Sequence, residues 1–215
     1  TPHLSRSLGI EVIYQEFNLI PTMSVAENVF IGDRIGGRFL VDIRKMKELT
    51  RQLFTQFNVE IDPDIYVRDL SPAQRQIVEI AKAVSKNVKI LIMDEPSAPL
   101  SVSEVEHMFD IIKQLKQKGV SIIYISHRLD EVFRISDRVT VFRDGQYVDT
   151  KITKETNRTE LIRLMVGREL KESYPTRTII PAEVALEIKN LSGNGDENIS
   201  FSVKKGEVLG IAGLV

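Results

Sequence analysis

The chain has 215 residues, of which 42% are apolar and 27% charged, and its formal net charge is −1. This composition is ordinary for a folded domain and supplies no global basic field that would recruit nucleic acid or an anionic membrane. The absence of cysteine excludes disulfides and thiolate metal sites, and no apolar run approaches the roughly 20 residues that cross a bilayer.

The first half of the chain is predicted to be mainly helical. An apolar stretch over 10–14 leads into Gln15 and a loop, where a surface glutamine is the ordinary interpretation. Apolar side chains recur at helical spacing over 42–57. A second helix is predicted to begin at Ser71 and to continue to Val84.

The start of this second helix is specified by local sequence. Ser71 is a good N-cap, Pro72 suits the first helical position, and Gln74 completes a capping box. A helix N-terminus also presents free N–H groups and the positive end of a dipole, which favour phosphate. Ser71, Ala73 and Gln74 are therefore candidates for nucleotide binding as well as for capping.

The middle of the chain alternates strands and helices. Residues 88–93 and 120–125 are short apolar runs, which are typical of parallel strands buried on both faces. Between them, Ser101 and Glu104 form a capping box for a helix that ends near Gly119. Strand, helix and strand with short connections predict a right-handed crossover and a parallel sheet, and so an α/β fold.

The elements that follow are shorter. They are a helix over 129–135, a hairpin over 138–148 that turns at Asp144-Gly145, a helix over 159–166 that closes at Gly167, and strands over 184–189, 199–203 and 207–212. Residues 168–183 contain Pro175 and Pro181 and little periodicity, so they are predicted to be a linker. This linker is the clearest domain boundary in the chain.

Asp94 and Glu95 directly follow the first parallel strand. Ligands of open parallel sheets bind beyond the carboxyl ends of the strands, so both carboxylates are expected at the ligand edge. In a Walker B arrangement the Asp holds Mg²⁺ and the next Glu activates the attacking water. The alternative is that Asp94 caps a turn and Glu95 is a solvated charge.

His127 directly follows the second parallel strand. The crossover is expected to bring this strand close to the first, so His127 is predicted to lie at the same edge as Glu95. There it could hydrogen-bond a γ-phosphate. A histidine after a strand is otherwise an ordinary loop residue, and no role is assigned to His3 or His107.

Taken together, four segments resemble one family. In chain order they resemble the Q-loop, signature, Walker B and switch-histidine motifs of ABC ATPases over roughly residues 8–150: Val12-Ile13-Tyr14-Gln15-Glu16, Leu70-Ser71-Pro72-Ala73-Gln74, Met93-Asp94-Glu95-Pro96 and Ser126-His127-Arg128. Finer matches resemble the tandem ATPase subunits of ribose-, galactose- and xylose-type importers: residues 19–28, 76–83, 124–133 and 165–170.

The resemblance implies a domain organisation. Residues 1–167 are expected to form a first ABC domain, with a P-loop NTPase-like parallel sheet and a helical subdomain over about 16–85. Residues 184–215 are expected to be the first strands of a second ABC domain. No G-x-x-x-x-G-K-[ST] phosphate loop occurs in the sequence. Both ends of the chain are therefore expected to be cut, and the fragment alone is expected not to hydrolyse ATP.

Two positions depart from the family pattern. Ala73 stands where the signature motif usually has its second glycine, and its β-carbon could hinder approach of a γ-phosphate. Ser101 stands in the D-loop stretch where many family members have Asp. These departures question how strongly this domain supports hydrolysis across a dimer interface.

For the intact protein, the resemblance implies an ATPase that binds ATP and Mg²⁺ and drives sugar uptake. Glu95 and His127 would be catalytic, Asp94 and Gln15 would serve Mg²⁺ and nucleotide, and Ser71, Ala73 and Gln74 would contact nucleotide. The expected partners are membrane permease subunits, indirectly an external sugar-binding protein, and the second ABC domain, but no nucleic acid. The expected place is the cytoplasmic face of the cell membrane. The alternatives are a non-catalytic permease-docking module and a soluble ABC ATPase of repair or translation.

Overall fold

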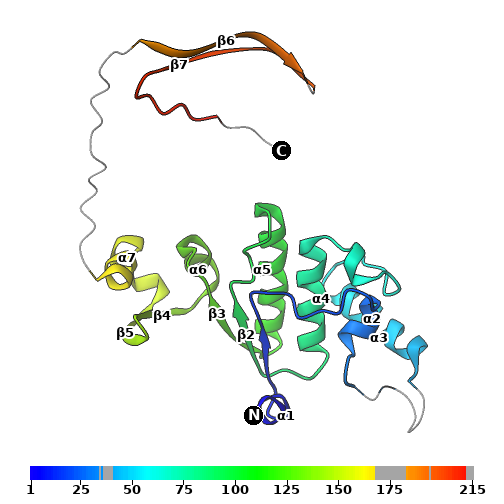
Figure 1. The fold of residues 1–215 in the computed structure, drawn as a ribbon. Coiled ribbons are helices and arrows are strands. Elements are labelled where there is room, and N and C mark those ends of the chain that lie inside the picture. The colour runs from blue at the N-terminus through cyan, green and yellow to red at the C-terminus, as the bar shows by residue number, and fades with distance from the viewer. Residues whose placement is uncertain (34, 36–40, 168–182, 194, 212–215) are drawn as a thin grey trace. The chain divides into compact units, whose positions relative to one another are not determined.

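The computed structural model describes residues 1–33, 35, 41–167, 183–193 and 195–211 (Figure 1). The chain divides into two compact units, Thr1–Gly167 and Arg168–Val215. The expected linker over 168–183 lies outside the described residues except for Glu183.

A three-stranded parallel sheet forms the centre of the first unit. Its order is β1 (Ile10–Ile13), β2 (Ile90–Asp94) and β3 (Ser121–Ile125). The register pairs Ile13 with Met93, and Asp94 with Ile125. The carboxyl ends of all three strands therefore meet at one edge, which confirms the predicted parallel sheet. Sequence patterning predicted the first half to be mainly helical and did not identify β1 as a strand of this sheet.

Helices before and after β2 supply most of the core. They are α2 (Val25–Val29), α3 (Ile43–Gln56), a 3₁₀ turn (Val67–Asp69), α4 (Pro72–Val84) and α5 (Val102–Gln117), whereas α1 (Pro2–Ser7) precedes β1 and adds no described side chain to this core. Helix α4 contacts α2, α3 and β1, and α5 contacts β3 (Figure 1). Leu91 and Met93 of β2 are fully buried in the same cluster as Phe54 of α3 and Phe109 of α5.

The sheet is buried on one face only, within the described residues. On β2, Leu91 and Met93 are buried whereas the alternate residues Ile90 and Ile92 are half-buried. On β3, Ile123 and Ile125 are 51% and 46% exposed. The prediction that both strands are buried on both faces is therefore wrong. Alternate side chains of a strand point to opposite faces, and the core cluster that contains α4 and α5 covers one of them.

The last part of the first unit has a small core of its own. It contains α6 (Leu129–Ile135), β4 (Arg138–Arg143), β5 (Gln146–Ile152), a 3₁₀ turn (Thr153–Glu155) and α7 (Arg158–Val166), packed around Leu129, Val141 and Leu161. Asp144 and Gly145 join β4 to β5 with φ of 51° and 74°. Two positive φ values favour the type I′ hairpin turn, so the predicted hairpin is confirmed.

The second unit contains β6 (Val184–Gly193) and β7 (Asp196–Lys204), which pair as an antiparallel ribbon. The third strand expected over 207–212 is absent from the described residues 207–211, and Ala212 lies outside them. Glu207 instead closes a tight turn: its carboxylate accepts from the Lys204 N–H at 2.7 Å, and its own N–H donates to the Lys204 carbonyl at 3.0 Å. The Glu207 N–H is therefore paired within a turn and not with a neighbouring strand.

In the part of the chain that the structure describes, none of the helices combines the length and apolar character that a membrane span requires.

Candidate functional site

Glu95 lies immediately beyond β2 in an unusual backbone conformation. Its φ is 46°, in the left-handed region, which costs of order 1–3 kcal/mol for a residue with a side chain. The Glu95 N–H donates to the Ile125 carbonyl at 3.0 Å, which ties this turn to the end of β3. Strain of this kind is often found at functional sites, because surrounding contacts must maintain it.

The Glu95 carboxylate lies between two side chains from the neighbouring strands. The His127 Nδ1 atom, from the loop after β3, is 2.9 Å from Glu95 Oε1. The Gln15 amide, from the loop after β1, donates to Glu95 Oε2 at 3.4 Å. The His127 side chain is 71% exposed, so the group is accessible from solvent. The predicted proximity of His127 and Glu95 is confirmed.

Asp94 is the last residue of β2 and is half-buried. No set of three or more His, Asp or Glu side chains within the described residues is arranged to hold a metal by itself. Mg²⁺ commonly takes only one or two carboxylates and completes its octahedron with water and substrate phosphates. The oxygen donors Asp94 and Gln15 therefore fit a Mg²⁺ that arrives with a phosphate ligand, and not a cage made by protein alone.

Ser71, Ala73 and Gln74 lie at the start of α4. The Ser71 Oγ atom accepts from the Gln74 N–H at 3.2 Å, and Gln74 Oε1 accepts from the Ser71 N–H at 2.9 Å. The predicted capping box is thus confirmed, and both side chains satisfy the helix end. No hydrogen bond connects these three residues to Glu95 or His127 among the described residues, so the structure forms two separate groups of candidate residues.

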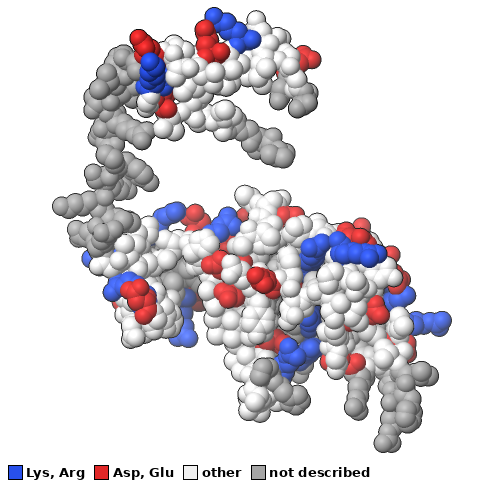
Figure 2. Space-filling model, in the orientation of Figure 1, with Lys and Arg blue, Asp and Glu red and all other residues white. Residues whose placement is uncertain are grey.

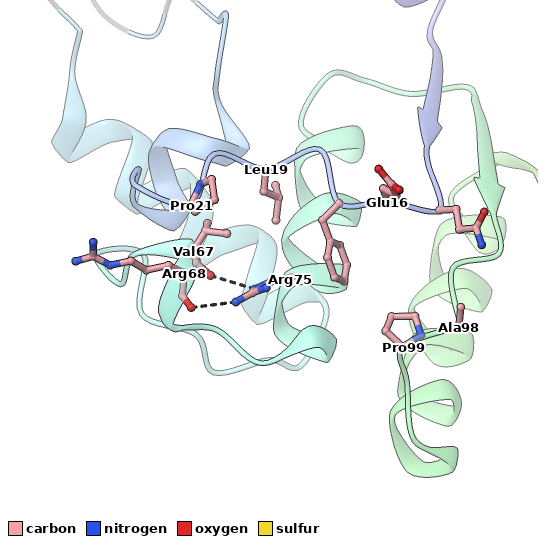
Figure 3. A pocket seen from close by; sticks show the side chains of 10 residues that line it. Glu16, Leu19, Pro21, Val67, Arg68, Arg75, Ala98 and Pro99 are labelled. Atoms are coloured by element: carbon pink, nitrogen blue, oxygen red, sulfur yellow. Dashed lines mark hydrogen bonds between the residues drawn. The ribbon is translucent and has the colours of Figure 1, made fainter.

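A groove of about 800 Å³ lies next to Gln15 (Figure 3). Its walls come from three segments: Glu16 to Pro21 after β1, Val67 to Arg75 before and within α4, and Ala98-Pro99 before α5. Arg75 shapes one wall by donating to the Val67 and Arg68 carbonyls at 3.2 and 2.9 Å. This groove was not predicted from the sequence, because its walls are far apart in the chain.

A polar clamp connects the loop after Gln15 to α4. The Asn18 N–H donates to Glu79 Oε1 at 2.5 Å, and the Asn18 carbonyl accepts from Lys82 Nζ at 2.6 Å. Burial raises the pKa of Glu79 and lowers that of Lys82, since it disfavours both charged forms. This clamp was not predicted from the sequence either. The available signal was two charges inside an otherwise apolar helical run.

Comparison with known families and sequences agrees with this geometry. Residues 2–98 match the family described as ABC transporter. The chain is 45% identical over 210 residues to the ribose import ATP-binding protein RbsA of Geobacillus kaustophilus, and 46% identical over 211 residues to the galactose/methyl galactoside import ATP-binding protein MglA of Haemophilus influenzae. Each match covers 96% of this chain and 42% of the relative. The chain thus spans less than half the length of these curated relatives.

Solved structures show the same fold. A crystal structure of an ATP-binding cassette of an ABC transporter in its ADP conformation superposes with a TM-score of 0.64 at 23% identity, covering 78% of this chain and 72% of that one. A nucleotide-free ATP-binding cassette gives a TM-score of 0.61 at 25% identity, covering 77% and 68%. The α/β fold expected from the motifs is therefore confirmed.

Proposed function

We propose that this chain belongs to the ABC transporter family and is part of the ATP-binding subunit of an importer that drives monosaccharide uptake by hydrolysing ATP. The observation that carries the proposal is the contact of Glu95 with both His127 and Gln15 at the carboxyl edge of the sheet. The names of the relatives, which are sugar import ATP-binding proteins, support the class of cargo.

Each side chain of this group has a defined chemical task in the proposal. Glu95 accepts a proton from the attacking water, and its bonds to Gln15 and His127 hold the carboxylate in place. His127 presents an exposed imidazole that hydrogen-bonds the terminal phosphate. Asp94 and Gln15 supply oxygen ligands toward Mg²⁺. When bound, Mg-ATP brings the phosphoryl group and the cation that offsets its charge.

The N-terminus of α4 serves a second site in this proposal. Ser71, Ala73 and Gln74 present the helix end to the nucleotide of a partner ABC domain, which accounts for their separation from Glu95. The phosphate loop that the sequence lacks must come from outside these 215 residues, and the fragment alone is inactive.

The groove beside Gln15 is the proposed contact for the membrane permease. It joins the loop that follows Gln15 to the helical subdomain, so an inserted segment would be sensitive to the position of that loop (Figure 3). The subunit would then be peripheral at the cytoplasmic membrane face, with the external sugar-binding protein reached only through the permease. On the visible face of the first unit, acidic and basic side chains are interspersed, which favours a protein partner over nucleic acid (Figure 2).

A non-catalytic docking module is the second candidate. The departures from the family pattern at Ala73 and Ser101 favour it. Ser101 bonds Glu104 at 2.7 Å as part of the α5 cap, so this position places no carboxylate in the loop after Glu95. The two candidates differ in one observable. A docking module binds the permease but leaves the rate of ATP hydrolysis independent of Glu95.

The deciding experiment is Mg-ATP hydrolysis by the natural-length protein with Glu95→Gln, in a background whose second ATP site is inactivated. Loss of a general base should lower kcat by about 10²–10⁴-fold, with the fold retained. Glu48→Gln on α3, which removes an exposed carboxylate whose side-chain hydrogen bond is to Gln52 and not to the Glu95 group, is the matched control. A rate unaffected by Glu95→Gln would contradict the catalytic proposal and favour the docking module.

A further inference from the structure

Glu131 is a buried carboxylate close to the site. It lies on α6, four residues after His127, and is only 4% exposed. Burial of an ionised carboxylate costs several kcal/mol unless charge and hydrogen bonds compensate it. A helix that needed only packing at this position would be served by an apolar residue, so its contacts must explain its presence.

Three hydroxyl groups converge on one oxygen of this carboxylate. Ser97 Oγ and Tyr124 OH each donate to Glu131 Oε2 at 2.7 Å, and Ser126 Oγ lies 3.3 Å from the same atom. Such bonds to an ionised acceptor are shorter and stronger than bonds between neutral groups. Burial, with the neighbouring Glu131, raises the pKa of Tyr124, so its phenol stays protonated as a donor.

The other oxygen faces a cation. Arg128 Nη1 lies 2.7 Å from Glu131 Oε1, which offsets the buried negative charge. Ser126 Oγ also accepts from the Arg128 N–H at 3.0 Å, which bends the chain around the intervening His127. Glu131 therefore holds the residues on both sides of His127.

The same carboxylate also holds the segment that carries Glu95. Ser97 is two residues after Glu95 and is itself buried. One acceptor atom thus connects the loop after β2 to the loop after β3. The distance between His127 and Glu95 depends on how these two loops sit relative to each other, and Glu131 connects the loops through contacts separate from the direct Glu95–His127 bond.

We propose that Glu131 is a positioning residue that fixes the His127 imidazole against the Glu95 carboxylate. Its consequence for ATP hydrolysis rests on the proposed function, whereas the positioning itself concerns contacts within this chain. Glu131→Gln keeps the shape of the side chain but removes its charge and replaces one acceptor oxygen by a donor. The variant should therefore release both loops.

The first test reads the position of His127 without using activity. The chain has three histidines, so selective ¹³C labelling of histidine gives three imidazole signals, assigned with one His→Gln variant each. Glu95→Gln defines the signal of a His127 ring that has lost its carboxylate partner. Asp130→Asn is the matched control, because it removes an exposed charge, paired with Arg158, at the neighbouring position of the same helix.

The expected result is that Glu131→Gln displaces the His127 signal toward its position in Glu95→Gln by at least half of that shift. The signals of His3 and His107 should stay in place, and Asp130→Asn should leave all three unchanged. A His127 signal that coincides with wild type in folded Glu131→Gln protein would overturn the proposal.

Two milder variants keep the test decisive if Glu131→Gln does not fold. Tyr124→Phe and Ser97→Ala each remove one hydroxyl donor to the carboxylate. Each should displace the His127 signal in the same direction by a smaller amount. Absence of any displacement in both folded variants would overturn the proposal as well.

Hydrolysis by the natural-length protein separates this inference from the proposed function. Glu131→Gln should lower kcat by about tenfold, because a misplaced reacting group costs rate, while KM for Mg-ATP stays within about twofold. A displaced His127 signal with unchanged kcat would support the positioning role and count against His127 as a catalytic residue. A drop in kcat with an undisplaced signal would count against positioning.

Discussion

At the scale of single residues, buried polar groups determine how the loops around the site are held. Glu95 keeps a left-handed backbone because its neighbours bind it on both sides, through Ile125 in the backbone and His127 in the side chain. Asn28 has a comparable role beside the groove. It is fully buried in α2, and its side-chain amide hydrogen-bonds backbone groups of the loop that follows Gln15.

Asn28→Ala should destabilise the fold strongly. Asn28 Oδ1 accepts from the Ile20 N–H at 2.7 Å, and Nδ2 donates to the Ile20 and Ser24 carbonyls at 3.0 Å each. Leaving these backbone groups without partners should cost about 2–3 kcal/mol of unfolding free energy, measured by urea denaturation. Gln52→Ala on the exposed side of α3 should change it by less than about 0.5 kcal/mol. Equal losses in both variants would contradict this account of Asn28.

At the scale of elements, the start of α4 is fixed by residues close in sequence, and its position is fixed by contacts with a distant segment. Its start is specified by Ser71 and Gln74, which bond to each other within one turn. Its position against the loop after Gln15 depends on Glu79 and Lys82, which bind Asn18 more than sixty residues away. Because Glu79 and Lys82 are both partly removed from water, their ionisation should make the unfolding free energy depend on pH.

The raised pKa of Glu79 fixes the sign of this dependence. The folded chain binds the proton of Glu79 more tightly than the unfolded chain, whose value is near 4.5. The contribution of Glu79 to the unfolding free energy therefore falls as pH rises from about 4.5 through the folded pKa. Glu79→Gln should remove that fall, so the unfolding free energy of the variant relative to wild type should rise as pH increases from about 4.5 through the folded-state pKa of Glu79.

Glu106→Gln provides a control of opposite sign. A hydrogen bond from Arg134 lowers the pKa of Glu106, so the stability it contributes is present above about 4.5 and is lost as pH falls. The relative stability of this variant should therefore fall as pH rises through about 4.5. Urea denaturation at a series of pH values measures the unfolding free energy of both variants relative to wild type. If this difference changed with pH in the same direction for both variants, the opposite pKa shifts of Glu79 and Glu106 would be refuted.

At the scale of the whole molecule, the chain contains the carboxyl edge of a parallel sheet, where we propose that nucleotide binds, without a phosphate loop. Backbone N–H groups and a lysine of that loop normally hold the β- and γ-phosphates. The motif is absent from all 215 residues, whereas Glu95, His127 and Gln15 are already in contact. The contacts among the three side chains to which we assign water activation are thus formed within a chain that has no such loop.

The 215-residue chain alone should therefore release no phosphate from Mg-ATP above the rate of the same chain with Glu95→Gln. A phosphate-release assay at saturating ATP measures this, with the natural-length protein as positive control. Hydrolysis by the isolated chain that Glu95→Gln abolishes would show that it holds the nucleotide without the loop, and would contradict the proposed division of labour.

Sequence alone determined the features that depend on interactions between residues only a few positions apart. The capping boxes at Ser71 and Ser101 and the turn at Asp144-Gly145 each depend on neighbouring residues and were predicted correctly. The order of the motifs also indicated the fold and the edge that carries Glu95 and His127. These signals are local or survive as spacing along the chain, so they can be found without coordinates.

Only the tertiary structure decided which distant groups meet and which faces stay open. It placed β1 beside β2, brought Gln15 to Glu95, assembled the donors around Glu131, and left Ile123 and Ile125 exposed. It also formed no third strand within 207–211. The physical reason is that such contacts depend on sheet register and on the packing partners of each face, and an apolar run or a lone glutamine has the same local pattern with or without them.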